Sequence, residues 1–304
     1  MPIIAQKTLD LIAKCLQEDQ GNSFRALQKE LLPLVEDAYT VETDQGLRSH
    51  LGASLIGQSC PRKIWYSWRW VKRPVHEGQL IRLFNRGHLE EARFVALLKM
   101  IGTEVWQFDQ TGKQFRIVGH KGHFGGGLDA VLRGVPDYPD TAILGEFKTH
   151  NEKSFTKLLA SGVEESKPEH YVQMNMYMGY YSLPAALYLA VNKNTDALYA
   201  EIVPFDASTY QRFTERVERI IDSDEAPPKI SNSPAWYQCK FCGDKDICHG
   251  EELPKVTCRS CAHVTAIAGG KWVCEKQSNH ELTKEEQLAA CSDYRMNPTI
   301  KSSV

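Results

Sequence analysis

The sequence predicts an α/β protein with a mixed central sheet flanked by helices, a helical N-terminal region and a small cysteine-rich C-terminal module. Through the middle of the chain, β-rich runs alternate with segments of helical periodicity, which is typical of α/β domains. Seven of the nine cysteines lie between Cys239 and Cys291. Because thiols spaced in this way in a reducing compartment usually hold a metal, the module is expected to be metal-binding.

The predicted elements follow one another along the chain from the N-terminus. Helices are expected over residues 9–16, 24–34, 61–70, 87–101 and 152–160, from Pro168 onward, and over 207–221. Strands are expected over residues 104–108, 114–118, 128–135, 142–148, 187–191 and 198–203. These elements predict a helical region over 1–50, an α/β domain over 51–250 and the cysteine-rich module over 251–304.

Composition excludes several classes of protein. The 304 residues carry 36 Lys and Arg against 38 Asp and Glu, and 42% of them are apolar. This is globular composition, so wholesale disorder and coating of nucleic acid by bulk positive charge are both excluded. No apolar run is long enough to cross a bilayer, and the first residues do not suit a secretory signal, so a cytoplasmic protein is expected.

A carboxylate–lysine constellation is the main indication of chemistry. Glu146-Phe147-Lys148 lies on a predicted strand, where residues two apart point to the same face. Asp129 follows three glycines at the start of another predicted strand, seventeen residues upstream of Glu146. Oxygen ligands of this kind suit Mg²⁺, which in phosphodiester hydrolysis acidifies a water, while a nearby lysine orients that water or offsets charge.

With these motifs the chain resembles the PD-(D/E)xK nucleases, specifically the RecB-like branch, over roughly Gly52 to Cys248. The resemblance implies a restriction-endonuclease-like fold for residues 51–250. It also implies that Asp129 and Glu146 hold Mg²⁺ or Mn²⁺, with Lys148 as the catalytic lysine.

Two further motifs belong to the same resemblance. Arg86-Gly87-His88-Leu89-Glu90-Glu91 is similar to the family's G-x-x-x-(E/H) element, and counting from its glycine selects Glu91 over Glu90 as an additional metal ligand. Gln173 and Tyr177 match the Q-x-x-x-Y motif of the RecB-like branch and share a helix face. Both are expected at the catalytic site.

Cys239, Cys242 and Cys248 supply three thiols of a first set, and Cys60 is the candidate for the fourth. One cysteine before the nuclease core and three after it is similar to the iron–sulfur nucleases of the AddB-type and CRISPR-associated RecB-like families. The resemblance implies a 4Fe–4S cluster that closes the nuclease domain. A Cys₄ zinc site remains open, as does a zinc site in which His249 replaces Cys60.

Cys258, Cys261, Cys274 and Cys291 form a second set, with a zinc-ribbon-like pattern. Such a short tail needs a metal to fold, so Zn²⁺ is expected here. His280 has suitable spacing to replace Cys291 as the last ligand.

The segment from Cys60 to Pro74 is basic and aromatic. Its cations neutralise phosphates and its aromatic rings can stack on unpaired bases, so it is a candidate DNA-binding segment. An amphipathic helix with its aromatics in the core is the alternative; a mixture of the two is expected, with Trp65 inside and Arg62 or Lys63 towards DNA. The candidate DNA contacts are Arg62, Lys63, Arg69, Lys72 and Arg73.

The leading hypothesis is therefore a metal-dependent DNA nuclease, an exonuclease of recombination, repair or phage DNA metabolism in a bacterial or phage-infected cytoplasm. Its expected partners are DNA ends or single strands and a protein of recombination or replication. The alternative is a nucleic-acid-binding or regulatory protein whose zinc module acts on an inactive nuclease scaffold. A CRISPR-adaptation nuclease is a third hypothesis, which leaves the zinc-like tail without an explanation.

Overall fold

The computed structural model describes residues 1–39 and 47–302. Its chain divides into two compact units, each built from separate stretches of sequence. Unit 1 comprises Met1–Thr43, His76–Ile117 and Gly127–Tyr210, and unit 2 comprises Asp44–Val75, Val118–Gly126 and Gln211–Val304. This division differs from the consecutive segments that the sequence suggested. No helix of the described residues is both long and apolar enough to cross a membrane.

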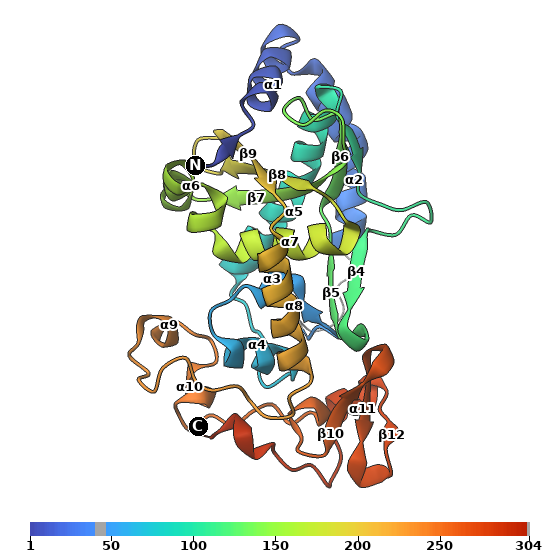
Figure 1. Ribbon diagram of the computed structural model, residues 1–304, viewed down its shortest axis with the longest axis vertical. Coiled ribbons are helices and arrows are strands. Elements are labelled where there is room, and N and C mark those ends of the chain that lie inside the picture. The colour runs from blue at the N-terminus through green and yellow to red at the C-terminus, as the bar shows by residue number, and fades with distance from the viewer. Residues whose placement is uncertain (40–46, 303–304) are drawn as a thin grey trace. The chain divides into compact units, whose positions relative to one another are not determined.

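A six-stranded mixed sheet forms the centre of unit 1, in the order β1-β9-β8-β7-β6-β3 (Figure 1). Its strands are β1 (Ile3–Ile4), β3 (Glu104–Trp106), β6 (Ala130–Arg133), β7 (Ile143–His150), β8 (Ala185–Asn192) and β9 (Leu198–Pro204). β7 and β8 run parallel, and the other neighbouring pairs are antiparallel. β8 is buried along its whole length, which explains its continuous apolar run. The predicted mixed central sheet is confirmed.

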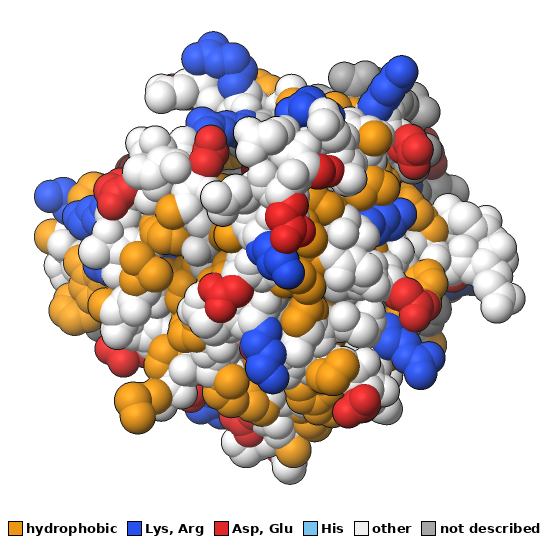
Figure 2. Space-filling model, turned by 90° about the horizontal axis from the view of Figure 1, so that it is seen from above, with side chains coloured by type: hydrophobic (Ala, Val, Ile, Leu, Met, Phe, Trp, Pro, Cys, Tyr) orange, Lys and Arg blue, Asp and Glu red, His pale blue; other side chains and the backbone are white. Residues whose placement is uncertain are grey.

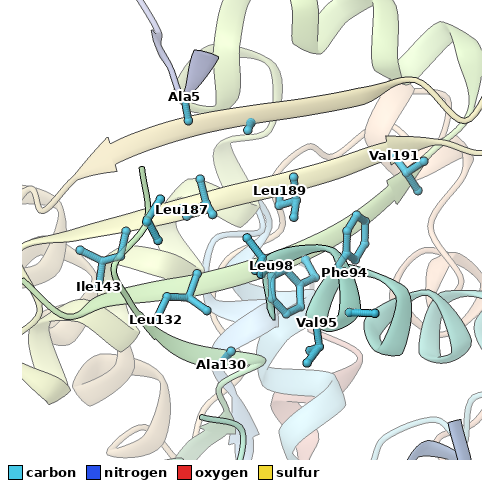
Figure 3. Close-up of a cluster of buried hydrophobic side chains, with 14 of the residues drawn as sticks. Ala5, Phe94, Val95, Leu98, Ala130, Leu132, Ile143, Leu187, Leu189 and Val191 are labelled. Carbon is cyan, nitrogen blue, oxygen red and sulfur yellow. The ribbon is translucent and has the colours of Figure 1, made fainter. Parts of the chain in front are cut away.

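Helices cover both faces of this sheet. They are α1 (Gln6–Glu18), α2 (Asn22–Tyr39), α5 (Gly78–Met100), α6 (Glu152–Ser166) and α7 (Pro168–Tyr181). α5 packs against β7, α1 and α2, and the apolar side chains at this interface form the core of unit 1 (Figure 3). Within it, Phe94 of α5 stacks on Phe147 of β7, with ring centroids 5.3 Å apart. Because strand side chains alternate, Glu146 and Lys148 point to the opposite face, where α6 and α7 pack.

The close packing of α7 leaves no room for a side chain at Gly179. A Cβ atom there would lie 2.2 Å from the ring of Tyr210. Gly179→Ala is therefore expected to lower the free energy of unfolding by about 1–3 kcal/mol, measured by urea denaturation. At Gly87, within α5, nothing lies within 4 Å of the added atom. Gly87→Ala is the matched control and should raise stability by about 0.5–1 kcal/mol; unchanged stability of Gly179→Ala would show that Tyr210 moves aside.

Unit 2 combines short helices with a small antiparallel sheet of order β10-β11-β12. Its elements are β2 (Leu51–Gly52), α3 (Ala53–Ile56), α4 (Pro61–Trp68), α9 (Tyr237–Lys240), α10 (Lys245–Cys248), β10 (Val264–Ile267), β11 (Lys271–Cys274), β12 (His280–Glu281) and α11 (Lys284–Ala289). β4 (Arg116–Gly119), β5 (Phe124–Gly127) and α8 (Ala207–Ile221) have residues in both units. Large aromatic side chains are buried within unit 2, namely Trp65, Tyr66, Trp68, Trp70 and Trp272.

Candidate functional site

Asp129, Glu146 and Lys148 meet at the sheet of unit 1. Glu146 and Lys148 share one face of β7, and Asp129 lies directly before β6, the antiparallel neighbour of β7. The Lys148 ammonium donates a hydrogen bond to Glu146 and lies 3.7 Å from a carboxylate oxygen of Asp129. That same oxygen, Oδ2, accepts the backbone N–H of Phe147 at 2.8 Å. The structure therefore brings together the three residues that the sequence singled out.

This cluster holds more negative charge than its lysine neutralises. Glu146 is completely buried, and its Oε2 has no hydrogen-bond partner in the described part of the chain. Burial raises the pKa of Asp129 to about 7; Lys148 opposes this shift, whereas Glu146 and Glu91 add to it. Burial alone would lower the pKa of Lys148, but Glu146 and Asp129 raise it above its ordinary value. Two carboxylates, those of Asp129 and Glu146, thus share one ammonium.

The two adjacent acids of α5 have different surroundings. Glu91 lies 3.7 Å from His88 and acts electrostatically on Asp129. Glu90 is buried and forms an ion pair with Arg93 at 3.1 Å. Burial also raises the pKa of Glu90, although Arg93 opposes the shift. Glu91 therefore lies with the carboxylate cluster, whereas Glu90 is occupied by Arg93.

A pair of substitutions tests this helix register. Glu91→Ala is expected to slow metal-dependent DNA cleavage by at least about 100-fold, because a lost metal ligand costs several kcal/mol of transition-state stabilisation. Glu90→Ala removes an acid one position away and should leave the cleavage rate within a few-fold of wild type. Both rates are measured at saturating Mg²⁺, and the opposite order would show that Glu90 is the functional acid.

Gln173 and Tyr177 lie on α7, on the Glu146 side of the sheet. The Gln173 amide donates to the Tyr177 hydroxyl at 3.3 Å, and both side chains are buried. Burial and the nearby carboxylate of Glu146 raise the pKa of Tyr177, so its hydroxyl stays protonated. The two residues therefore form a neutral hydrogen-bonding layer next to the carboxylates.

A histidine–tyrosine array that the sequence did not predict lies beside Lys148. The Tyr188 hydroxyl lies 2.8 Å from His150 Nε2 and 2.9 Å from His170 Nδ1. Burial lowers the pKa of His150 to about 4 and that of His170 to about 3, and Lys148 contributes to both shifts. The array is therefore uncharged at neutral pH. Because Glu146, Lys148 and His150 alternate along β7, the sequence contained a signal for His150. Only the fold places His170 and Tyr188 beside it.

In unit 2, Cys60 lies near Cys239, Cys242 and Cys248, although it is far from them in the sequence. Burial raises the pKa of each of the last three thiols, and the neighbouring Cys60 adds to each shift. All four are free thiols. The structure thus gathers the four residues of the first predicted set.

The second predicted set, Cys258, Cys261, Cys274 and Cys291, lines a single pocket. Burial raises the pKa of Cys258 to about 11, with the other three thiols adding to the shift. Among the side chains that the structure describes, residues 1–32 and 47–302, no group of three or more His, Cys, Asp or Glu was found that could hold a metal ion.

The basic segment is largely internal, which corrects part of its expected role. Trp65 is buried as predicted, but the expectation that Arg62 faces DNA is wrong, because its guanidinium is buried and donates to the carbonyls of Pro227 and Ser302. Arg69 is likewise buried among tryptophans. Of the proposed DNA contacts, Lys63 and Lys72 are half-buried and Arg73 is exposed. Figure 2 shows both charges interspersed over the face it presents.

Comparison with solved structures shows distant similarity only. The crystal structure of SSO0001 matches 74% of this chain and 97% of its own at 16% identity and a TM-score of 0.38. The alkaline exonuclease LHK-Exo from Laribacter hongkongensis matches at 14% identity and a TM-score of 0.41, covering 58% of this chain and 87% of its own. Its complex with dAMP matches at 14% identity and a TM-score of 0.41, covering 57% and 86%. No family model and no curated protein matches the sequence.

Proposed function

We propose that the protein is a metal-dependent nuclease that hydrolyses phosphodiester bonds in DNA. The observation that carries this proposal is the buried Oε2 of Glu146, which has no partner among the described residues and lies in a cluster with excess negative charge. An unpartnered buried carboxylate oxygen is costly unless a cation pairs with it. Mg²⁺ or Mn²⁺ fits this donor set, because both prefer carboxylate oxygens.

The side chains of the cluster have distinct roles in this proposal. Asp129, Glu146 and Glu91 would hold the cation. When bound, such a cation acidifies a water and stabilises the charge that develops on the phosphate. Lys148 is held between Glu146 and Asp129, so its ammonium is fixed where it can donate to an attacking water or to a phosphate oxygen.

The side chains around the cluster are neutral. Gln173 and Tyr177 lie next to Glu146, and the Tyr188 array lies next to Lys148. Because none of these groups is charged at neutral pH, none competes with the carboxylates for the Lys148 ammonium. Their proposed role is positioning.

We further propose that the substrate is DNA presented as an end or a single strand, cleaved as an exonuclease of recombination, repair or phage DNA metabolism, with a recombination or replication protein as partner. Lys63, Lys72 and Arg73 are the remaining proposed phosphate contacts, although Lys72 is shared with Glu252 at 2.8 Å. Reversing Arg62 is unsuitable as a test of binding, because a carboxylate would be buried in its place.

For the first thiol set we propose a 4Fe–4S cluster held by Cys60, Cys239, Cys242 and Cys248, with zinc as the alternative. Two arginines lie close enough to the thiols to stabilise negative charge there. Arg62 lowers the pKa of Cys248, and Cys60 raises the pKa of Arg216 against the effect of burial. Anaerobically purified protein should contain about four irons per chain. A colourless sample with zinc in place of iron would exclude the cluster and leave the nuclease proposal untouched.

The nuclease proposal is tested with end-labelled single- and double-stranded DNA in Mg²⁺, Mn²⁺ or EDTA. Cleavage with either metal and none in EDTA is expected, and the ladder of products gives polarity and distinguishes exonuclease from endonuclease. DNA binding without cleavage in any metal would favour the alternative of an inactive nuclease scaffold that binds nucleic acid.

A further inference from the structure

A pocket of unit 2 combines thiols from separate segments of the tail. Cys258 and Cys261 flank a single helical turn, Cys274 ends β11, and Cys291 follows α11. The first three are buried, and none of the four forms a disulfide. His263 also lines the pocket, and its buried Nε2 has no hydrogen-bond partner in the described residues. An unpartnered imidazole nitrogen facing clustered thiols indicates a missing polar partner.

Two arginines are buried beside this pocket. Arg259 lies between Cys258 and Cys261, with its guanidinium 3.7 Å from the ring centroid of Trp70 and 4.7 Å from that of Trp272. Arg69 approaches Trp272 from α4's C-terminal end, at 5.2 Å, and donates to the backbone carbonyl of Cys261. Both guanidiniums are buried, and arginine is a cation at neutral pH.

These two buried charges are not balanced by carboxylates. Arg259 donates to the Gln287 side chain and to the backbone carbonyls of Arg48 and Trp68, and no carboxylate among the described side chains of residues 1–32 and 47–302 pairs with it. Arg69 has one acidic partner, Asp224, at 3.3 Å, and that side chain is 58% exposed. Buried guanidiniums with so little counter-charge are unfavourable unless another anion lies close by.

We infer that Cys258, Cys261, Cys274 and Cys291 bind one Zn²⁺ as four thiolates, and that Arg69 and Arg259 are its counter-charges. Four thiolates and one Zn²⁺ carry a net charge of −2, which matches two guanidiniums. Such a site explains why two arginines are buried beside the thiols. It is independent of the nuclease proposal, because its tests measure zinc and not cleavage.

The charge balance and the pocket lining both select Cys291 over the histidines as the fourth ligand. His280, which the sequence left open, lies outside the pocket lining, and its Nε2 is 3.1 Å from a carboxylate oxygen of Glu286. Ligation by His263 in place of a thiolate would reduce the net charge to −1. His263 is instead assigned as a donor from Nε2 to a thiolate sulfur, which satisfies its unpartnered nitrogen.

The zinc content of the full-length protein tests the ligand set. Wild type is saturated with Zn²⁺, dialysed against a mild chelator and measured by mass spectrometry for metals. Cys291→Ser is expected to lose one zinc per chain relative to wild type, whereas His280→Ala and His263→Gln keep it. Co²⁺ in place of Zn²⁺ should give a thiolate-to-cobalt charge-transfer band that weakens in Cys291→Ser. Unchanged zinc in Cys291→Ser, or its loss in either histidine variant, would overturn the assignment.

Arg259 variants test the counter-charge. Arg259→Met keeps the apolar stem but removes the cation, so zinc affinity should fall about 10- to 100-fold, as for other groups that support metal ligands. Arg259→Lys keeps the charge but also loses the stacking of the guanidinium on the tryptophans. It should nevertheless bind zinc more tightly than Arg259→Met, which separates the effect of charge from any loss of stability caused by altered stacking. Lys271→Met is the matched control, since this exposed cation of β11 pairs with Glu281. Equal zinc affinity of wild type and Arg259→Met would refute the charge balance.

Discussion

Glu146→Gln is expected to abolish DNA cleavage, with a loss of at least about 10³-fold in rate. The substitution keeps the shape of the side chain but removes the charge that pairs with Lys148 and that would hold the cation. Loss of a metal ligand costs several kcal/mol of transition-state stabilisation, and about 1.4 kcal/mol corresponds to a factor of ten. Cleavage rates at saturating metal measure the effect; Asp129→Asn should behave in the same way.

Glu201→Gln is the matched control for this experiment. Glu201 is also a buried acid on the same face of the sheet, opposite Tyr188 in β9, but it accepts hydrogen bonds from the Val163 backbone and the Tyr199 hydroxyl. Its role is structural, so Glu201→Gln should lower the melting temperature and leave the metal-dependent rate nearly unchanged. Cleavage by Glu146→Gln at the wild-type rate would exclude this carboxylate cluster as the active site.

Ending the chain after Gly250 is expected to unfold unit 2 and not to remove a separate module. Trp272 packs on Trp68 with ring centroids 4.8 Å apart, and the Tyr66 hydroxyl donates to the carbonyl of Ile300. Without residues 251–304 these aromatic side chains would be exposed to solvent. Loss of packing around one large aromatic side chain costs about 3–5 kcal/mol, and a whole domain is stable by only about 5–15 kcal/mol.

Tryptophan fluorescence and limited proteolysis measure this outcome. Residues 1–250 alone should show red-shifted emission and rapid cleavage between residues 47 and 75, relative to the full chain. A truncated protein with wild-type emission and protease resistance would support the division near residue 250 that the sequence suggested. Such a result would show that residues 47–75 fold without the tail.

Local sequence patterns correctly predicted many of the helices and strands. The alternation of Glu146 and Lys148 on one strand is fixed by the two-residue period of a strand, so their common face follows from the sequence alone. The expected closing helix over residues 207–221 coincides with α8, because its apolar residues keep helical spacing to the end. The short strands β1, β2 and β5 were missed, because two to four residues are too few to establish a period.

The basic segment shows where local patterns fail. Lysines and arginines are usually exposed, so the spacing of cations among the aromatics did not predict that Arg62 and Arg69 are buried. Their burial depends on the carbonyls of Pro227 and Ser302 and on Trp272, all more than 150 positions away in the chain. Contacts between residues so far apart in the chain produce no periodic pattern in the sequence.

The sequence by itself determined the mixed α/β class, the strand that presents Glu146 and Lys148, and the closely spaced cysteine pairs of the tail, because each depends on periodicity or on spacing between neighbours. Only the tertiary structure decided that Arg62 and Arg69 are buried, that Tyr188 joins His150 to His170, and that the tail shares its core with residues 47–75. These outcomes depend on which side chains remain buried together after the chain has folded, and burial among distant residues is a property of the packed structure.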